Sequence, residues 1–478
     1  MLKVYNVLNH KKEDFNPIDG KKVGMYACGI TASGSAHIGH AYQAVIFDVI
    51  RSYLEYIGYD VTYVRNYTDV DDKIIIKARE KGIDPKEYAE SIMAEIDSQF
   101  DLLGVKKPTI QSKATECIDD MIDFISKLIE TGHAYATEYG DVYFKVSSYG
   151  KYGHFSNRTA GEELLSGVRK DLEPGKLDDR DFALWKHAGT DEIFWESPWG
   201  KGRPGWHIEC SAMSMKYLGE TLDIHGGGKD LIFPHHENEI AQSEALTGKQ
   251  FSKYWLHNGL VKVNGQKMSK SLNNGILLGD LLSEYNGDVI KLTLLQNSYR
   301  SDLNIMDGIF DSNESRIYSA YKLLSKINKE FAGVEPDSEN ELAKKIKKEF
   351  LDAMNNDFNT ALATANLFGY ISELTKMVNK KADPAGIVAA RDALLEVYGV
   401  MRLLQIDPEE AVNNTKEKYL KKAGLTFAEV DEMLQTWYKS KSEKDFATAD
   451  EIRNKLSEKG ISVSDRQGVV EWDIMFKK

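Results

Sequence analysis

The chain of 478 residues has few cysteines and no long apolar run. Its three cysteines, Cys28, Cys117 and Cys210, cannot all pair with one another, which argues against a disulfide-stapled fold. We therefore expect a reducing, cytoplasmic compartment. The sequence has no stretch of 18 apolar residues, so we expect no transmembrane helix. Its first fifteen residues also lack the apolar core of a secretory signal peptide.

The chain also lacks the basic excess that is typical of general nucleic-acid-binding proteins. Its formal net charge is −13. The charge is uneven, because residues 416–478 carry 13 Lys and Arg against 12 Asp and Glu, a net charge of +1, which leaves −14 for the rest. A polyanionic partner should therefore contact local basic patches rather than a uniformly positive surface.

The first part of the chain has an α/β pattern. The length predicts about three or four domains. Residues 22–28 predict a buried strand, residues 37–57 a helix with apolar side chains at helical spacing, and residues 61–67 a second strand. A strand–helix–strand unit of this kind implies a right-handed crossover and a parallel sheet. We therefore predict a Rossmann-like parallel-sheet domain over residues 1–310.

The remaining segments predict an insertion and two further parts. Residues of about 108–200 read as an insertion that contains a helix near 113–131 and then a hairpin. Residues 311–406 have almost purely helical spacing, which predicts a helix bundle. A polar linker is predicted at 406–418. A small α+β unit follows within 407–478, with helices near 426–440 and 445–459 and a final hairpin.

The segment His37-Ile38-Gly39-His40 stands where a predicted strand passes into a helix. Free backbone N–H groups and the helix dipole attract phosphate at such a point. Two imidazoles there can donate hydrogen bonds to oxygens that gain charge during a reaction. Taken alone, the segment is equally compatible with a helix that carries two surface histidines.

The segment Lys267-Met268-Ser269-Lys270-Ser271 lies between glycine and asparagine residues, a pattern that suits a loop. Two ammonium groups on a loop can hold a leaving pyrophosphate. The alternative is an exposed basic loop without a ligand.

Together, and in this order, the two segments resemble the paired signatures of the class I aminoacyl-tRNA synthetases, and their context is similar to that of cysteinyl-tRNA synthetases. The resemblance covers nearly the whole chain. The matching segments are 26–29, 66–73 (NYTDVDDK), 181–186, 202–214 (GRPGWHIECSAMS), 223–245 and 255–272. The chain departs from the family pattern at positions that affect loop geometry: Ile30, Ser33, Gly34, Tyr42 and Asn273.

The resemblance implies a class I fold and an ATP-dependent activation of L-cysteine, followed by transfer to the terminal adenosine of cysteine tRNA. It implies Mg²⁺ with ATP, and we expect a monomer. The implied residues fall into three groups: catalytic His37, His40, Lys267 and Lys270; ATP-binding Gly39, Asp230 and Lys270; and amino-acid-binding Gly29, Thr68 and Trp206.

A metal site is also implied. Cys28, Cys210, His235 and Glu239 supply two thiolates, an imidazole and a carboxylate, a donor set that suits one Zn²⁺ per chain. His235 and Glu239 share a helix face at i, i+4. From the residues alone, His236 with Glu239 at i, i+3 is also possible, and two cysteines without a Cys-x-x-Cys spacing favour buried free thiols over a metal site. The resemblance favours zinc and His235.

The last helical segment, 444–456, resembles an anticodon-reading domain, in which Phe446 would stack on a base and Asp450 would accept hydrogen bonds from base amino groups. The alternative for Phe446 is a core position on an amphipathic helix. Two other functions are weighed. A cysteine ligase that joins cysteine to an amino sugar would need no anticodon-reading unit, and an inactive RNA-binding relative would need no intact signature residues.

Overall fold

The computed structural model describes residues 1–158, 175–189, 193–268, 274–381, 383–466 and 469–476. The chain divides into two compact units. The first comprises residues 1–306 and 350–364, and the second comprises residues 307–349 and 365–478. Among the described residues, no helix is long and apolar enough to cross a membrane.

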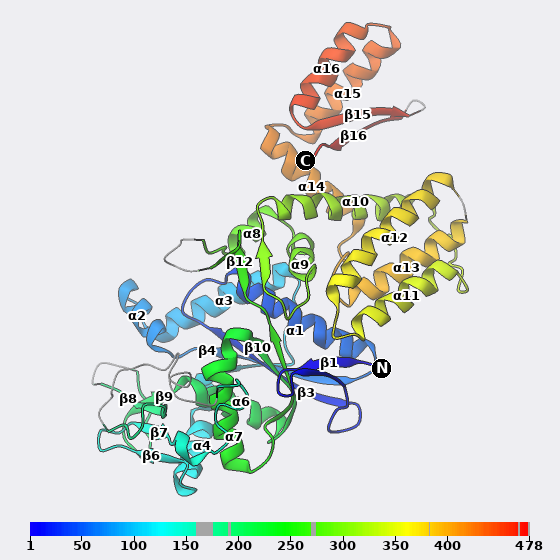
Figure 1. Cartoon of the computed structure of the whole chain (residues 1–478). Coiled ribbons are helices and arrows are strands. Elements are labelled where there is room, and N and C mark those ends of the chain that lie inside the picture. Colours follow the sequence, from blue (N-terminus) through cyan, green and yellow to red (C-terminus); the bar gives the residue numbers. More distant parts are fainter. Residues whose placement is uncertain (159–174, 190–192, 269–273, 382, 467–468, 477–478) are drawn as a thin grey trace. The chain divides into compact units, whose positions relative to one another are not determined.

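The first unit is built on a five-stranded sheet with the order β11-β10-β3-β4-β5, in which every pair is parallel (Figure 1). The order reverses between β3 and β10, which is the point where ligands bind in open α/β sheets. The sheet confirms the predicted fold class. Its strands are β3 (Lys22–Thr31), β4 (Asp60–Thr68), β5 (Ile110–Lys113), β10 (Leu222–Gly228) and β11 (Ser252–Asn258).

Helix α1 (Ile38–Tyr56) connects β3 to β4, as the periodicity predicts. Its middle is buried throughout, because parallel sheets are covered by helices. Helix α7 (Glu237–Thr247) ends before Gly248, which adopts the left-handed conformation that favours glycine there. The other helices of this part are α2 (Asp72–Lys81), α3 (Pro85–Leu103), α4 (Ile118–Glu130) and α6 (Trp206–Leu218).

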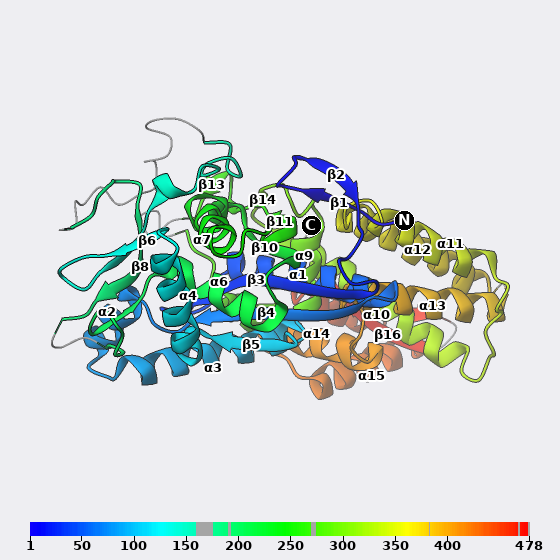
Figure 2. The same ribbon diagram turned by 90° about the horizontal axis from the view of Figure 1, so that it is seen from below.

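The insertion starts later than predicted. The expected start near residue 108 is wrong, because β5 at Ile110–Lys113 pairs with β4 in the parallel sheet. The expected hairpin is present as the first two strands of a separate antiparallel sheet (Figure 2). That sheet contains β6 (Ala134–Ala136), β7 (Val142–Phe144), β8 (Phe182–His187) and β9 (Gly202–Pro204).

Two smaller parts complete the first unit. The N-terminal hairpin pairs β1 (Lys3–Asn6) with β2 (Lys11–Asp14). A three-stranded sheet places β12 (Val261–Val263) between β13 (Gln266–Lys267) and β14 (Leu303–Ile305). Residue 267 therefore ends a short strand, Met268 follows it, and the last three residues of the lysine motif, 269–271, lie outside the described residues. Helices α8 (Leu278–Glu284) and α9 (Gly287–Leu295) lie between β13 and β14 in sequence.

The second unit is mainly helical. The predicted polar linker at 406–418 is wrong, because α14 begins at Pro408. Asp407 accepts hydrogen bonds from two N–H groups of the first turn, and Pro408 suits that turn. The helices and strands of this part of the chain are α10 (Ile309–Glu330), α11 (Glu341–Met354), α12 (Thr360–Lys380), α13 (Pro384–Gly399), α14 (Pro408–Ala423), α15 (Phe427–Ser442), α16 (Phe446–Glu458), β15 (Ile461–Arg466) and β16 (Val469–Ile474). The end of α11 and the start of α12, within residues 350–364, belong to the first unit.

Candidate metal centre and nucleotide site

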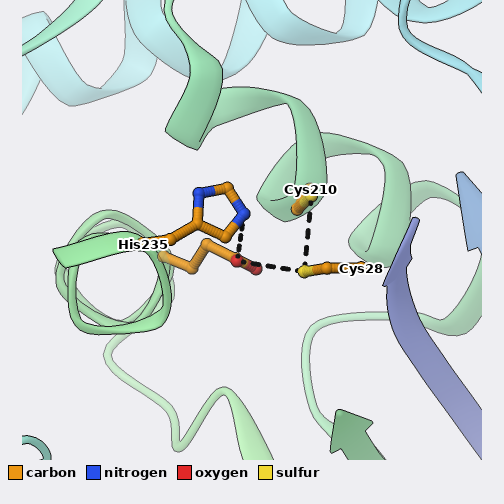
Figure 3. A group of neighbouring side chains, drawn as sticks. Cys28, Cys210 and His235 are labelled. Atoms are coloured by element: carbon orange, nitrogen blue, oxygen red, sulfur yellow. Dashed lines mark hydrogen bonds and ion pairs between the residues drawn. The ribbon is translucent and has the colours of Figure 1, made fainter. Parts of the chain in front are cut away.

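Cys28, Cys210, His235 and Glu239 lie together and buried at the sheet's reversal point (Figure 3). Their ligand atoms all lie within 4.8 Å of one another. Cys28 Sγ is 3.6 Å from Cys210 Sγ and 3.5 Å from Glu239 Oε1, while His235 Nε2 is 3.0 Å from Glu239 Oε1. Ligands of a tetrahedral zinc ion are about 3.3–3.8 Å apart, given bonds of about 2.0–2.3 Å. Two of these three distances lie in that range and the His235–Glu239 distance is slightly shorter, so the spacing is close to that of a zinc site, and the donor types fit zinc.

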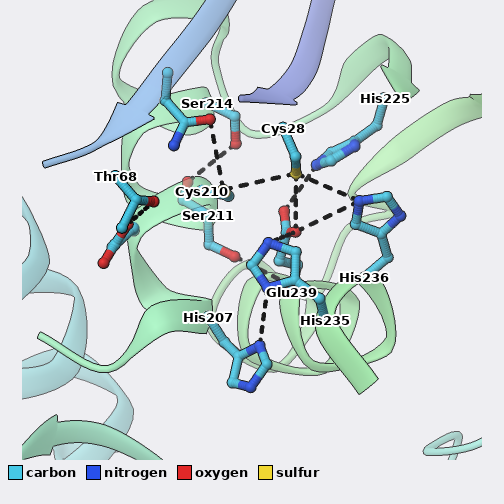
Figure 4. Close-up of polar contacts among 12 residues, drawn as sticks. Cys28, Thr68, His207, Cys210, Ser211, Ser214, His225, His235, His236 and Glu239 are labelled. Atoms are coloured by element: carbon cyan, nitrogen blue, oxygen red, sulfur yellow. Dashed lines mark hydrogen bonds and ion pairs between the residues drawn. The ribbon is translucent and has the colours of Figure 1, made fainter. Parts of the chain in front are cut away.

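The described residues contain a second group that could hold a metal ion: Cys28, His225 and His236 (Figure 4). His236 Nε2 lies 3.3 Å from Cys28 Sγ, and its Nδ1 lies 2.7 Å from His257 Nε2. His225 Nε2 lies 2.7 Å from Glu239 Oε2. Both groups contain Cys28. His236 therefore lies next to the first group, whether or not it binds the metal itself.

The electrostatics of the first group favour a cation. Burial raises the pKa of Cys28 well above its usual value, whereas the hydrogen bond from Cys28 lowers the pKa of Cys210 to about 6. Burial alone would raise the pKa of Glu239, but His225 and His235 outweigh it and hold that pKa well below its usual value. Burial would lower the pKa of His235, but Glu239 and Cys210 raise it to about 10. The group therefore holds a thiolate and a carboxylate whose charge is only partly balanced by the His235 ring, and a bound cation would compensate the rest.

The predicted amino-acid residues surround this group. A side chain at Gly29 would place its Cβ 1.6 Å from the carbonyl oxygen of Asn66, so only glycine fits there. Trp206 stacks on His235 with ring centroids 4.1 Å apart, and it is 40% exposed, so it lines the site rather than the core. Thr68 is buried and donates to Glu209 Oε2 at 2.6 Å.

His37 and His40 begin α1 as a reciprocal cap. His37 Nδ1 accepts from Gly39 N at 3.1 Å, and His40 Nδ1 accepts from His37 N at 3.3 Å. Burial lowers the pKa of both rings, that of His40 to about 3. Both rings are therefore neutral, with the proton on Nε2, because each Nδ1 is already an acceptor. The cap leaves two Nε2–H donors beside a helix N-terminus.

The glycines at the end of β10, which precede the predicted ATP-binding residue Asp230, leave no room for a side chain. A Cβ at Gly226 would come within 2.2 Å of the Phe47 ring, and one at Gly228 would come within 2.5 Å of Asp230 Oδ1. Asp230 is exposed, and its charge raises the pKa of His37 against the larger effect of burial. The run of glycines thus lets Asp230 lie near the α1 N-terminus.

The lysine motif approaches the same helix end. A Cβ at Gly39 would lie 3.7 Å from Met268 Cε, which places that methionine beside the first signature. Lys267 is exposed on β13. Lys270 and Asn273 lie outside the described residues. Of the departures from the family pattern, Tyr42 is buried, and its hydroxyl donates to Tyr299 O at 3.1 Å.

The sequence motifs do not identify several residues that lie at the site. His207 Nδ1 lies 3.0 Å from His235 Nδ1, and His225 and His257 are buried beside the metal group. The sequence does show three further histidines, at 207, 225 and 257, in the same part of the chain as Cys210, His235 and Glu239. That they lie together in space is decided by the fold. Glu209 gives no sequence signal, since it resembles any acidic residue in a first helical turn.

In the second unit, Phe446 is 61% exposed on α16, so the core alternative for this residue is wrong. Asp450 is also exposed, and its carboxylate lies 3.1 Å from Arg453 of the next turn. Both side chains are accessible to a partner.

The sequence matches two family models and is similar over nearly its whole length to known proteins. The family model of the tRNA synthetases class I (C) catalytic domain matches residues 14–315, and that of the DALR domain matches residues 349–405. A cysteine–tRNA ligase from Thermodesulfovibrio yellowstonii is 43% identical over 487 residues and covers 99% of both chains. One from Syntrophotalea carbinolica is 44% identical over 480 residues and covers 98% of this chain and 99% of its own.

Solved structures show the same fold at low identity. The Mycobacterium tuberculosis methionyl-tRNA synthetase in complex with methionyl-adenylate aligns with a TM-score of 0.60 at 15% identity, over 85% of this chain and 95% of that one. The LeuRS–tRNA–LeuAMS ternary complex of Agrobacterium radiobacter aligns with a TM-score of 0.59 at 12% identity, over 84% and 88%.

Proposed function

Because the chain belongs to the cysteine–tRNA ligases, a family of class I aminoacyl-tRNA synthetases, we propose that it activates L-cysteine with ATP and transfers it to the terminal adenosine of cysteine tRNA. The observation that carries the proposal is the buried group of two cysteines, a histidine and a glutamate at the sheet's reversal point. The comparisons do not support the amino-sugar ligase alternative.

Activation begins when the cysteine carboxylate, which is ionised at neutral pH, attacks the α-phosphate of ATP and pyrophosphate leaves. This step needs no general base, so catalysis consists of positioning and charge stabilisation. In our proposal the Nε2–H groups of His37 and His40 donate to the phosphate oxygens. Gly39 leaves room for the nucleotide at the helix N-terminus.

The other nucleotide contacts are assigned as follows. Lys267 and Lys270 hold the departing pyrophosphate, and Asp230 accepts hydrogen bonds from the adenosine ribose. Mg²⁺ accompanies ATP and neutralises part of its charge. The 3.7 Å approach between the Gly39 Cβ position and Met268 supports the assignment of the lysine motif, because it joins that motif to the first signature.

For the metal we propose Zn²⁺, held by Cys28, Cys210, His235 and Glu239. When bound, zinc would supply a soft acceptor that prefers a thiolate to a hydroxyl, and so would separate cysteine from serine. Gly29, Thr68 and Trp206 line the space beside this group and are assigned to the amino acid. Such selectivity at the first step would make a separate hydrolytic editing site unnecessary.

We assign tRNA reading to residues 407–478, with stacking on Phe446 and hydrogen bonds to Asp450. The exposure of both side chains supports this assignment. The division into a catalytic domain (1–310), a helix bundle (311–406) and a tRNA-reading unit (407–478) is likewise part of the proposal. We also propose that the enzyme acts in the cytoplasm, and its three free cysteines are compatible with a reducing compartment. That it acts as a monomer is a separate part of the proposal.

The test is ATP–pyrophosphate exchange with each amino acid in turn, followed by charging of cysteine tRNA. We expect exchange with cysteine and little with serine, and charging of cysteine tRNA alone. Exchange that is independent of cysteine, or activation without tRNA charging, would contradict the proposal.

A further inference from the structure

Asp302 is a carboxylate that joins two parts of the chain to which we assign nucleotide contacts, and the reaction described above gives it no role. It stands directly before β14, the strand that pairs with β12. Its Oδ1 accepts hydrogen bonds from Lys229 Nζ and, at 3.1 Å, from Leu260 N. Its Oδ2 lies 3.0 Å from Lys262 Nζ. One side chain therefore contacts both the end of β10 and the start of the β12–β13 hairpin.

On the first side, Asp302 holds the segment that carries Asp230, which we assign to the adenosine ribose. Lys229 lies between Gly228, the last residue of β10, and Asp230. The ion pair between Lys229 and Asp302 therefore restrains the backbone directly beside Asp230. We call residues 228–230 the ribose segment.

On the second side, Asp302 holds the β12–β13 hairpin, which carries Lys267 and which we call the lysine hairpin. Lys262 on β12 is the partner of Lys267 on β13. Two residues after Asp302, the side chain of Asn304 accepts a hydrogen bond from Gly265 N, in the turn of the hairpin, at 2.7 Å. Side chains from one short segment of the chain thus bind the lysine hairpin at its strand and at its turn.

The Asp302 carboxylate is charged at neutral pH. Burial would raise its pKa, but the hydrogen bonds from Lys229, Lys262 and Leu260 N lower it to about 2. The three side chains are partly exposed to solvent, and ion pairs of this kind add little to the stability of a fold. The loss of the charge should therefore alter the local geometry more than the stability.

We propose that Asp302 is a positioning residue of the activation step, which fixes the distance between the ribose segment and the lysine hairpin through its ion pairs with Lys229 and Lys262. ATP must contact both parts at once, because its ribose and its terminal phosphates belong to one molecule. A misplacement of about 1 Å in a reacting complex can cost about 10²-fold in rate. This assignment rests on the proposed function and adds to it the residue that holds the two parts together.

The test compares ATP, which spans both parts, with adenosine, which occupies only the ribose segment. The kcat, the KM values for ATP and cysteine, and the inhibition constant of adenosine are measured in cysteine-dependent ATP–pyrophosphate exchange. Asp302→Asn removes the charge and keeps an oxygen for Leu260 N, and it should lower kcat/KM for ATP roughly 10-fold. The KM for cysteine and the inhibition constant of adenosine should stay within about twofold of the parent values, because neither molecule contacts both parts.

Three further variants make the result specific. Asp302→Glu keeps the charge and should retain most of the parent kcat/KM for ATP. Asp302→Asn combined with Lys229→Met should be no worse than Asp302→Asn alone, because Lys229 acts through this carboxylate. Glu220→Gln is the matched control: it breaks the ion pair with Lys249, which lies before the other ends of β10 and β11, and it should leave all the constants unchanged.

Equal losses for ATP and adenosine, an unchanged kcat/KM for ATP, or additive losses in the double variant would overturn the assignment, since each outcome shows that Asp302 does not link the two parts. If Asp302→Asn does not fold, as thermal unfolding would show, Lys262→Met decides by the same comparison, because it removes one ion pair and keeps the carboxylate. Failure of the unmodified chain to activate cysteine would instead refute the proposed function, so the two failures are distinguishable.

Discussion

The choice between His235 and His236 as the metal ligand gives the sharpest test of the metal centre. His235 Nε2 points at Glu239 Oε1 at 3.0 Å, and its Nδ1 is held 3.0 Å from His207. His236 Nε2 lies 3.3 Å from Cys28 Sγ, and its Nδ1 is held 2.7 Å from His257 Nε2. Replacement of each histidine by asparagine keeps an amide near the position of Nδ1 and removes Nε2.

The two substitutions should reduce the affinity for zinc by different amounts. Four-ligand zinc sites bind with about 10–16 kcal/mol, so one ligand of four accounts for about 2.5–4 kcal/mol. His235→Asn should therefore weaken zinc binding by roughly 10²–10³-fold. His236→Asn removes only a hydrogen bond to a ligand, for which the usual loss is about 10- to 100-fold.

The assay is zinc content after dialysis against a graded series of a chelator, with thermal unfolding as a check that each variant is folded. His235→Asn should release zinc at a lower chelator concentration than His236→Asn. The reverse order would refute the reasoning and place His236 in the ligand set, with Cys28 and Glu239 as its partners.

Three further outcomes are expected, the first from the proposed role of the lysine motif and the other two from the described geometry. Lys270→Ala should slow cysteine-dependent ATP–pyrophosphate exchange by roughly 10²–10³-fold, with the KM for cysteine nearly unchanged, because the loop acts on phosphate; an unchanged rate would remove Lys270 from the mechanism. Phe446→Ala should leave exchange and thermal stability unaltered, because this side chain is 61% exposed, while the KM for cysteine tRNA rises; an intact tRNA KM would show that Phe446 does not read the anticodon. His40 has a folded-state pKa of about 3 against an ordinary value near 6.5, so the unfolded chain binds one more proton between these values. Its contribution to stability is therefore lost as the pH falls, by about 1.4 kcal/mol per pH unit between pH 6 and 4. Denaturant titrations of the parent and of His40→Gln should show a slope that is smaller by this amount in the variant, and equal slopes would contradict it.

Local pattern was sufficient for most elements of this chain. Helix α1 could be predicted because its apolar residues recur with the 3.6-residue period of an α-helix. The parallel arrangement of the strands on either side of it could be predicted because such crossovers are almost always right-handed. The paired signatures were readable because each is a short contiguous segment. The error at 406–418 has a local cause as well: the Asp407-Pro408 helix start was present in the sequence, but the polar character of the segment favoured a linker.

The site itself depends on contacts that no local pattern contains. Cys28 and Cys210 are 182 residues apart, and they meet because α6 packs against β3 and its two neighbours, β4 and β10. The burial of Glu209 beside Thr68, the second group formed by Cys28, His225 and His236, and the exposure of Phe446 were likewise decided by packing. The sequence determined which side chains are available and which local structures they form. Only the tertiary structure decided which of them are removed from water together, and that removal makes their charges and hydrogen bonds strong enough for specific chemistry.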